Sequence, residues 1–148
     1  MGTKVNLQLP DDKPFKEQDF NIVIVDENAT YRNQLASRLR MMGFYIEFAT
    51  GGFHLMHILE KEGKNFHLVI VHNNMSDMSA YEMTGLIRTF KSKSELPILF
   101  LSRSVSPEDL KELVTFGIND FYQKTNEQHK IAEKVQKFFA ARKTAIAS

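Results

Sequence analysis

Short apolar runs alternate with longer amphipathic segments from Asn21 to the end of the chain. The runs are rich in Val, Ile, Leu and Phe and are four or five residues long. Runs of this kind are typical of strands buried on both faces of a parallel sheet. The pattern predicts strands at residues 22–25, 45–48, 68–71, 97–101 and 118–122.

The segments between these runs predict helices, because their apolar residues recur at helical spacing and several segments end beside a glycine. The predicted helices are 30–42, 53–62, 81–91, 107 to about 117, and 126–142. The clearest start is Ser106, a favourable cap followed by Pro107 at the first helical position. In the helix 81–91 the residues expected to share one apolar face are Met83, Leu86, Ile87 and Phe90.

The alternation of strand and helix decides the fold class. Short strands joined by helices of ten or more residues need parallel pairing and right-handed crossovers. The sequence therefore predicts an α/β fold with a five-stranded parallel sheet, doubly wound, with helices on both faces. We expect this domain to span residues 21–142, between an N-terminal tail at 1–20 and a C-terminal tail at 143–148.

Composition narrows the class of protein further. A chain of 148 residues suits one domain. The 19 basic and 18 acidic residues leave a net charge of +1, which argues against binding nucleic acid or a membrane surface. The absence of cysteine removes disulfides and thiolate chemistry. With no apolar stretch long enough to span a membrane and no signal peptide pattern, we expect a cytoplasmic protein.

Candidate functional residues follow the predicted strands, because sites in doubly wound sheets gather at the carboxyl ends of the strands. Asp26 and Glu27 follow the first strand and suit a divalent cation such as Mg²⁺. Ser102 and Lys124 follow the fourth and fifth strands and could contact phosphoryl oxygens. The nucleophile of a phosphoryl transfer would stand after the third strand, where the sequence has His72.

Nucleotide binding is a weaker hypothesis. The chain contains neither GxGxxG nor GxxxxGK[ST], the motifs that cradle phosphates. We expect the pair Gly51–Gly52 only to start the helix that follows it. The acidic segment 26–28 would repel a phosphate.

Taken in order, these strand ends resemble the receiver domain of two-component response regulators. The resemblance covers residues 21–139 and rests on the segments IVIVDE, LVIVHNNMSDMSAYEM, PILFLSRS and GINDFYQKT. It implies the flavodoxin-like receiver fold. It also implies that Asp26 and Glu27 match the acids that hold Mg²⁺, while Ser102 and Lys124 match the hydroxyl and the lysine of the phosphorylation pocket.

The resemblance assigns three further positions. Asn74 matches the residue whose backbone carbonyl contacts the cation. Phe121 matches an aromatic switch residue, and we expect its ring to lie inward because it has no hydroxyl to satisfy. Arg103 stands where the family has a small residue, so it could cover Glu27 as a plug or lie in solvent.

The main departure from the family is His72, which occupies the position of the aspartate that accepts the phosphate. An imidazole cannot form an acyl phosphate and is a poor ligand for Mg²⁺. We expect weak or absent Mg²⁺ binding, and His72 packed between Asp26 and Lys124 with a hydrogen bond to an acid that raises its pKa. A zinc or small-ligand site, and phosphorylation of His72 itself, stay open alternatives.

Other departures lie in the surrounding loops. Ser76 replaces a proline, and Ser79–Ala80 replaces the usual Asp-Gly. Thr125 replaces the proline after Lys124, so we expect a trans bond there, since a non-proline cis bond costs about 2.5–4 kcal/mol.

These departures predict a degenerate, or pseudo-, receiver domain that is not an enzyme and needs no cofactor. It would signal by protein–protein interaction without aspartyl phosphorylation. The resemblance implies a partner, either another signalling protein or a second copy, on the surface of the fourth helix, fifth strand and fifth helix, at about 106–143.

Overall fold

The computed structural model describes residues 16–61, 65–72 and 75–147. A 3-10 turn, η1 (Glu17–Asp19), precedes alternating strands and helices. The strands are β1 (Asn21–Val25), β2 (Tyr45–Ala49), β3 (Leu68–His72), β4 (Ile98–Ser102) and β5 (Asp120–Gln123). The helices are α1 (Ala29–Met41), α2 (Gly52–Glu60), α3 (Ala80–Arg88), α4 (Pro107–Phe116) and α5 (Gln128–Ala147).

The strands form one parallel sheet in the order β2-β1-β3-β4-β5. The chain leaves β1 toward one edge of the sheet to form β2 and then returns to the other side to form β3. This reversal creates a topological switch point between the carboxyl ends of β1 and β3, which is where such sheets place their sites. The predicted doubly wound α/β fold is confirmed.

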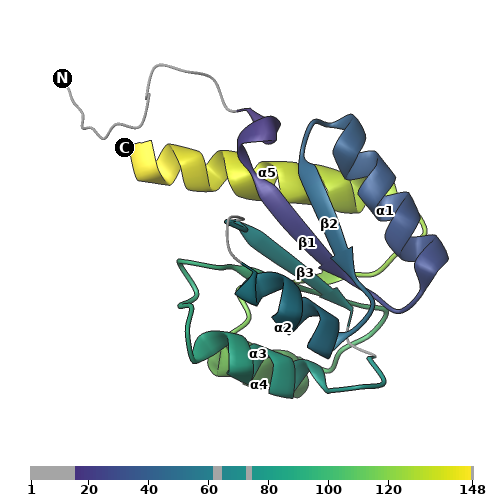
Figure 1. Ribbon diagram of the computed structural model, residues 1–148, viewed down its shortest axis with the longest axis vertical. Coiled ribbons are helices and arrows are strands. Elements are labelled where there is room, and N and C mark those ends of the chain that lie inside the picture. The colour runs from purple at the N-terminus through teal and green to yellow at the C-terminus, as the bar shows by residue number, and fades with distance from the viewer. Residues whose placement is uncertain (1–15, 62–64, 73–74, 148) are drawn as a thin grey trace.

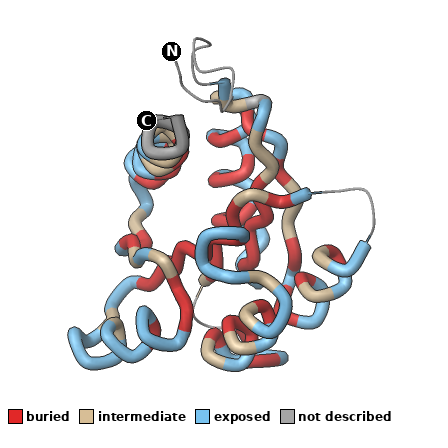
Figure 2. The backbone as a smooth tube through the Cα atoms, turned by 90° about the vertical axis from the view of Figure 1, so that its left-hand side faces the viewer, coloured by how far each residue is buried: buried red, intermediate tan, exposed pale blue. Residues whose placement is uncertain are grey.

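The helices form one layer on each face of the sheet, with α1 and α5 on one side and α2, α3 and α4 on the other (Figure 1). Alternate strand residues feed two separate cores. Val23, Val69 and Phe100 pack with the α2–α4 layer, while Ile24 and Ile70 pack with α1 and α5. The buried segments accordingly run through the middle of the molecule (Figure 2). Within the described part of the chain, none of the helices is both long and apolar enough to cross a membrane.

Two predicted helix starts are confirmed. The Ser106 hydroxyl accepts a hydrogen bond from the Asp109 amide at 3.1 Å, and Pro107 begins α4. The pair Gly51–Gly52 starts α2, whose first amides donate to the carboxylate of Asp77 at 3.0 and 2.9 Å. The end of α2 that would attract an anion is therefore already occupied by an internal acid.

The structure differs from the predicted α3. The helix ends at Arg88 rather than residue 91, because the Arg88 guanidinium donates to the carbonyls of Lys91, Ser92 and Leu96 and holds the chain in a turn. The apolar face that these residues were expected to share is only partly covered. Met83 and Ile87 are fully buried, whereas the exposed fractions of Leu86 and Phe90 are 43% and 44%.

The described structure extends past both predicted domain boundaries. Phe20 stacks on Phe139 with ring centroids 4.4 Å apart, so η1 and Phe20 pack against α5. Helix α5 continues to Ala147.

Strand β5 begins at Asp120, two residues later than predicted, since the side chain of Asn119 instead accepts a hydrogen bond from the Ile98 amide.

Candidate phosphorylation pocket

The register of the sheet gathers the predicted site residues at one edge. Val25 pairs with Val71, and His72 pairs with Leu101. On the other side of β4, the Lys124 amide donates to the Ser102 carbonyl at 2.8 Å. Side chains at or directly after the last residues of β1, β3, β4 and β5 therefore surround the switch point, as predicted. They are Asp26, His72, Ser102 and Lys124.

A buried ion pair occupies the centre of this group. The Lys124 ammonium donates to one carboxylate oxygen of Asp26 at 3.0 Å, and each side chain is 4% exposed. The other oxygen of Asp26 accepts from the Asn28 amide at 2.9 Å. Burying a charge is costly unless it is paired and hydrogen-bonded, and both conditions are met here.

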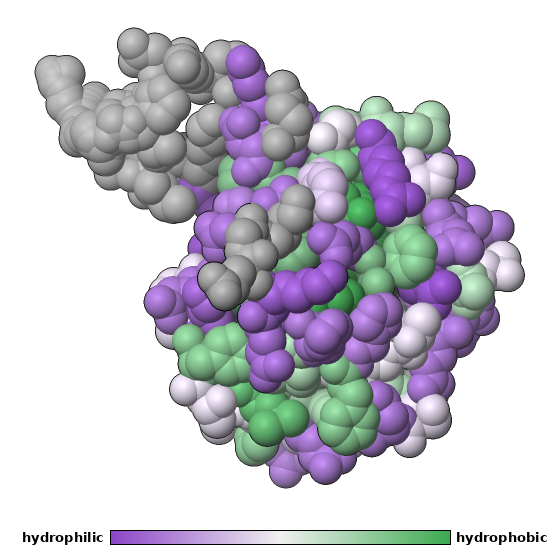
Figure 3. All heavy atoms as spheres, in the orientation of Figure 1, coloured by the Kyte–Doolittle hydropathy of each residue, from purple (hydrophilic) through white to green (hydrophobic). Residues whose placement is uncertain are grey.

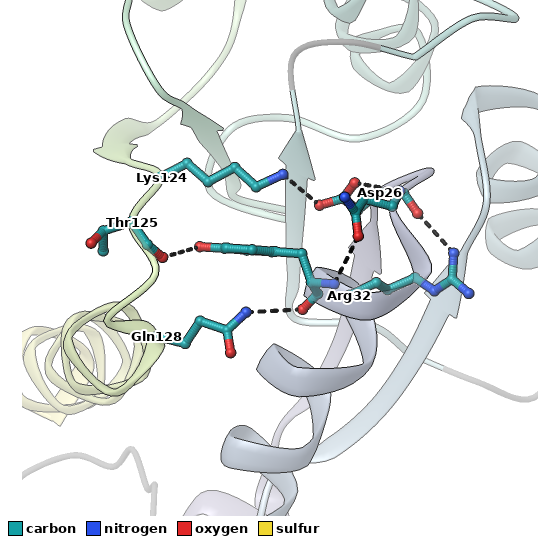
Figure 4. Close-up of polar contacts among 7 residues, drawn as sticks. Asp26, Arg32, Lys124, Thr125 and Gln128 are labelled. Carbon is teal, nitrogen blue, oxygen red and sulfur yellow. Dashed lines mark hydrogen bonds and ion pairs between the residues drawn. The ribbon is translucent and has the colours of Figure 1, made fainter.

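Tyr31 ties helix α1 to the connection between β5 and α5. Its hydroxyl donates to the Thr125 carbonyl at 2.9 Å, and its own carbonyl accepts from the Gln128 side chain at 3.1 Å (Figure 4). The Lys124 ammonium lies 4.2 Å from the centre of the Tyr31 ring. We call these contacts of Tyr31, Lys124, Thr125 and Gln128 the Tyr31 latch. The predicted trans bond between Lys124 and Thr125 is confirmed.

Arg32 completes the buried side of the pocket. It donates to the Asp26 carbonyl at 2.9 Å, and its guanidinium lies 4.6 Å from the centre of the Phe48 ring. Sequence reasoning missed the polar roles of both Tyr31 and Arg32. Tyr31 stands at helical spacing with the apolar Leu35 and Leu39, but a buried tyrosine hydroxyl needs a hydrogen-bond partner, and this need is the signal that the sequence offers.

Glu27 lies on the exposed side of the pocket. Its carboxylate accepts from the Ser76 amide at 2.6 Å and from the Ser76 hydroxyl at 2.5 Å. These two hydrogen bonds lower the pKa of Glu27. Beside it opens a hollow of about 550 Å³ lined by Glu27, residues 75–79 and Glu82. Through the two hydrogen bonds from Ser76, Glu27 holds in place the chain segment that leads from β3 to α3.

His72 is half-buried, and its Nδ1 is buried without a hydrogen-bond partner in the described part of the chain. Burial lowers the pKa of its imidazole, and Asp26 counteracts this only in part. The predicted hydrogen bond to an acid and the predicted rise in pKa are both wrong. The reason is that Asp26 is bonded to Lys124 instead.

The remaining predicted residues lie around this centre. The Ser102 hydroxyl donates to the Ser104 carbonyl at 2.9 Å. The Phe121 ring is half-buried, lies 6.4 Å from that of Phe100 and packs against the core, in agreement with an inward ring. Arg103 is exposed and forms no ion pair with Glu27 among the residues described. Asn74 lies outside the described residues.

The acidic side chains beside His72 already have partners within the protein, which bears on Mg²⁺ binding. Mg²⁺ prefers several oxygen ligands in octahedral geometry. Here Asp26 is bonded to Lys124, Glu27 is bonded to Ser76, and His72 offers a nitrogen. In residues 16–61, 65–72 and 75–147, no three acidic or histidine side chains are grouped to hold a metal ion.

Known proteins share this arrangement of strands and helices. Residues 22–136 match the family model of the response regulator receiver domain. The chain is 27% identical over 123 residues to the chemotaxis protein CheY-3 of Vibrio cholerae, which covers 82% of the chain and 93% of CheY-3. The structure of CheY4 from V. cholerae matches with a TM-score of 0.72 at 23% identity, covering 80% of the chain and 97% of CheY4.

Larger signalling proteins contain a similar segment. The chain is 29% identical over 115 residues to the autoinducer sensor kinase/phosphatase CqsS of V. cholerae, covering 77% of the chain. It spans only 16% of CqsS and 8% of the Escherichia coli sensor protein EvgS. The receiver domain of yeast Ssk1, solved with the histidine phosphotransfer protein Ypd1, matches with a TM-score of 0.73 at 24% identity, covering 88% of the chain and 94% of its own. The sheet order, the residues at its carboxyl edge and the family match agree, and the chain belongs to the response regulator receiver domain family.

Proposed function

We propose that this chain is a pseudo-receiver domain, a module of two-component signalling that acts through protein–protein interaction without aspartyl phosphorylation. The observation that carries the proposal is the end of β3. There His72 stands beside an Asp26 carboxylate that is already paired with Lys124 at 3.0 Å. In this proposal the domain is not an enzyme, binds Mg²⁺ weakly or not at all, and works in the cytoplasm.

The chemistry of the pocket supports this proposal. An acyl phosphate forms on a carboxylate oxygen, and His72 supplies none. The Lys124 ammonium, which could neutralise a phosphoryl group, instead neutralises Asp26. A phosphate entering the pocket would have to break this buried pair and leave Asp26 without its partner, at a cost of several kcal/mol.

The Tyr31 latch supports the second part of the proposal, which is a fixed conformation. The latch joins α1 to the β5–α5 connection without any phosphate. We therefore propose that the surface formed by α4, β5 and α5 is held in one state. Its partner would be another signalling protein, as Ypd1 is for Ssk1, or a second copy. Nucleic acid and membranes are not part of this proposal.

Phosphorylation by a small phosphodonor tests the proposal. We expect the full chain, incubated with acetyl phosphate and Mg²⁺, to keep its intact mass. The matched variant is His72→Asp, which restores a carboxylate at the end of β3 and is expected to gain a phosphoryl group. A phosphoryl mass on the unaltered chain would contradict the proposal.

A phosphoryl-accepting His72 is the second candidate function. It is favoured by the lowered pKa of the imidazole, because the neutral ring is the nucleophilic form. If the unaltered chain gained a phosphoryl group that His72→Gln did not, this second function would replace the first. Calorimetric titration with Zn²⁺ tests the remaining alternative, a metal sensor built from His72, Asp26 and Glu27.

A further inference from the structure

Exposed apolar side chains are unevenly divided between the two faces of the molecule. Apolar atoms gather at the lower end of the view in Figure 3, over α2 and α3. Among the described residues, the large exposed apolar side chains of the α2–α4 layer are Phe53, Leu86, Phe90, Val114 and Phe116. Only two other large apolar side chains of the described residues are exposed, Met41 on α1 and Tyr45 on β2. Exposed apolar side chains gathered on one face mark a candidate interaction site.

Helix α3 lies at the centre of this apolar surface. Leu86 lies on the exposed side of the helix, and Phe90 lies in the turn directly after it. On the side of α3 that faces α4, Phe116 lies over Gly85, and a Cβ atom on Gly85 would come within 3.3 Å of the Phe116 ring. The rings of Phe116 and Tyr81 meet edge to face, with their centroids 5.8 Å apart. Glycine destabilises a helix interior relative to alanine, but here it makes room for Phe116. We call Leu86, Phe90 and Phe116 the α3 ridge.

One end of this surface has a net negative charge and the other a net positive charge, with Lys111 among the acids and Glu95 among the bases as exceptions. Helices α3 and α4 run in the same direction, because Tyr81 near the start of α3 contacts Glu112, while Arg88 at its end contacts the Gly117 carbonyl. The first turns carry Glu82, Glu108 and Asp109, and Glu112 follows one turn later. Beyond the end of α3 lie Lys91 and Lys93, and Lys93 donates to the Val114 carbonyl at 3.3 Å.

A surface with opposite charges at its two ends is complementary to itself in one arrangement. A two-fold axis through the middle of α3 sets the second α3 antiparallel to the first. This places the acidic end of each copy against the basic end of the other and the α3 ridges against each other. A parallel arrangement would instead oppose like charges.

We propose that the chain forms a two-fold homodimer through the α3 ridge, with the two α3 helices antiparallel. This surface differs from the α4–β5–α5 surface of the proposed function. The inference does not depend on whether the pocket is phosphorylated. The pairing of copies would cover the apolar side chains that the single chain leaves exposed.

Sedimentation equilibrium of the full chain tests the apolar part of the proposal. We expect a monomer–dimer equilibrium that Leu86→Gln and Phe116→Gln each weaken roughly tenfold or more, as expected for apolar residues near the centre of an interface. The control is Met41→Gln, which removes an apolar side chain that is 84% exposed on α1 and should leave the equilibrium unchanged. A chain that stays monomeric up to millimolar concentration would overturn the proposal.

Charge exchange tests the antiparallel arrangement. One variant, Lys91→Glu with Lys93→Glu, makes the basic end acidic, and another, Glu108→Lys with Glu112→Lys, reverses two of the four acidic side chains at the other end. We expect neither variant to form a homodimer, whereas an equimolar mixture forms a heterodimer, provided that circular dichroism shows both to be folded. Homodimers that survive in both variants, or a dimer weakened only by substitutions on α5, would show that another surface pairs the copies.

Discussion

The buried and exposed halves of the pocket treat two adjacent acids differently. Asp26 is 3% exposed and is paired with Lys124 on β5's side of the sheet. Glu27 is exposed and is hydrogen-bonded to Ser76 in the loop that follows β3. The resemblance assigned these two carboxylates to one cation, whereas here each has its own protein partner. The difference shows that the two acids hold neighbouring segments of the chain in place: Asp26 binds Lys124 after β5, and Glu27 binds Ser76 after β3.

The largest expected effect comes from breaking the buried half. Lys124→Met leaves the Asp26 carboxylate buried without its cation, and removing one member of a buried pair costs about 3–5 kcal/mol. We expect a loss of that order in the free energy of unfolding, measured by urea denaturation. The matched control is Lys130→Met, which breaks the solvent-exposed pair with Glu127 and should cause no measurable loss.

Equal losses in the free energy of unfolding for Lys124→Met and Lys130→Met would contradict the contrast between the buried and exposed halves of the pocket. They would mean that the Asp26–Lys124 pair is as well hydrated as the surface pair. The Tyr31 latch would then lack the fixed charge on which it rests.

An intermediate effect is expected from Tyr31→Phe. The change removes the hydroxyl that donates to the Thr125 carbonyl but keeps the ring beneath Lys124, so we expect a loss of about 1 kcal/mol. Amide NMR should show increased motion in residues 125–128, where the latch is released. Unchanged relaxation there would show that Tyr31 does not hold the β5–α5 connection.

Protonation of the two half-buried histidines, His67 and His72, is expected to have a smaller effect. Burial lowers the pKa of both His72 and His67, whose Nδ1 accepts from the Asn21 amide at 3.0 Å. The unfolded chain then binds more protons as the pH falls below about 6.5, so the free energy of unfolding decreases. His72→Gln should reduce this decrease without abolishing it, because His67 still contributes. A decrease of unchanged size, measured by urea denaturation at several pH values, would refute a low pKa for His72.

The smallest effect is expected in the exposed half. Ser76→Ala removes one of the hydrogen bonds that lower the pKa of Glu27, so this pKa should rise toward its usual value. Ionised Glu27 would then contribute less to the free energy of unfolding above its unfolded pKa. Less of that free energy would be lost as the pH falls. Carboxyl NMR titration measures the change, and Glu127, whose pKa is lowered by Lys130, is the internal control. No movement of the Glu27 pKa would contradict the assigned hydrogen bond.

The sequence predicted the fold and the strand-end residues because both follow from local patterns. A four- or five-residue apolar run identifies a strand, and the switch-point rule then places Asp26, Ser102 and Lys124 at one edge. The partner of each residue was harder to predict. His72 lacks its expected hydrogen bond because Asp26 could be reached by a lysine from β5's end, 98 positions along the chain.

The exposed positions of α3 and the Tyr31 latch were missed for a related reason. Helical spacing identifies the residues that share a face but not how much of that face a neighbouring helix covers, so Leu86 and Phe90 were taken as one stripe with Met83 and Ile87. Tyr31 meets Thr125 across 94 positions, a contact that only the packing of α1 beside α5 creates.

The central claim, a pocket closed to the phosphoryl group by its own ion pair, is tested most directly by NMR with a phosphoryl mimic. The full chain is titrated with beryllofluoride and Mg²⁺, and the amides of Ser102, Phe121 and Lys124 are followed. We predict no saturable shifts at these residues, because Asp26 keeps Lys124 and His72 offers no carboxylate. Saturable shifts centred on these three amides would show that the pocket still accepts the phosphoryl group, and would contradict the claim.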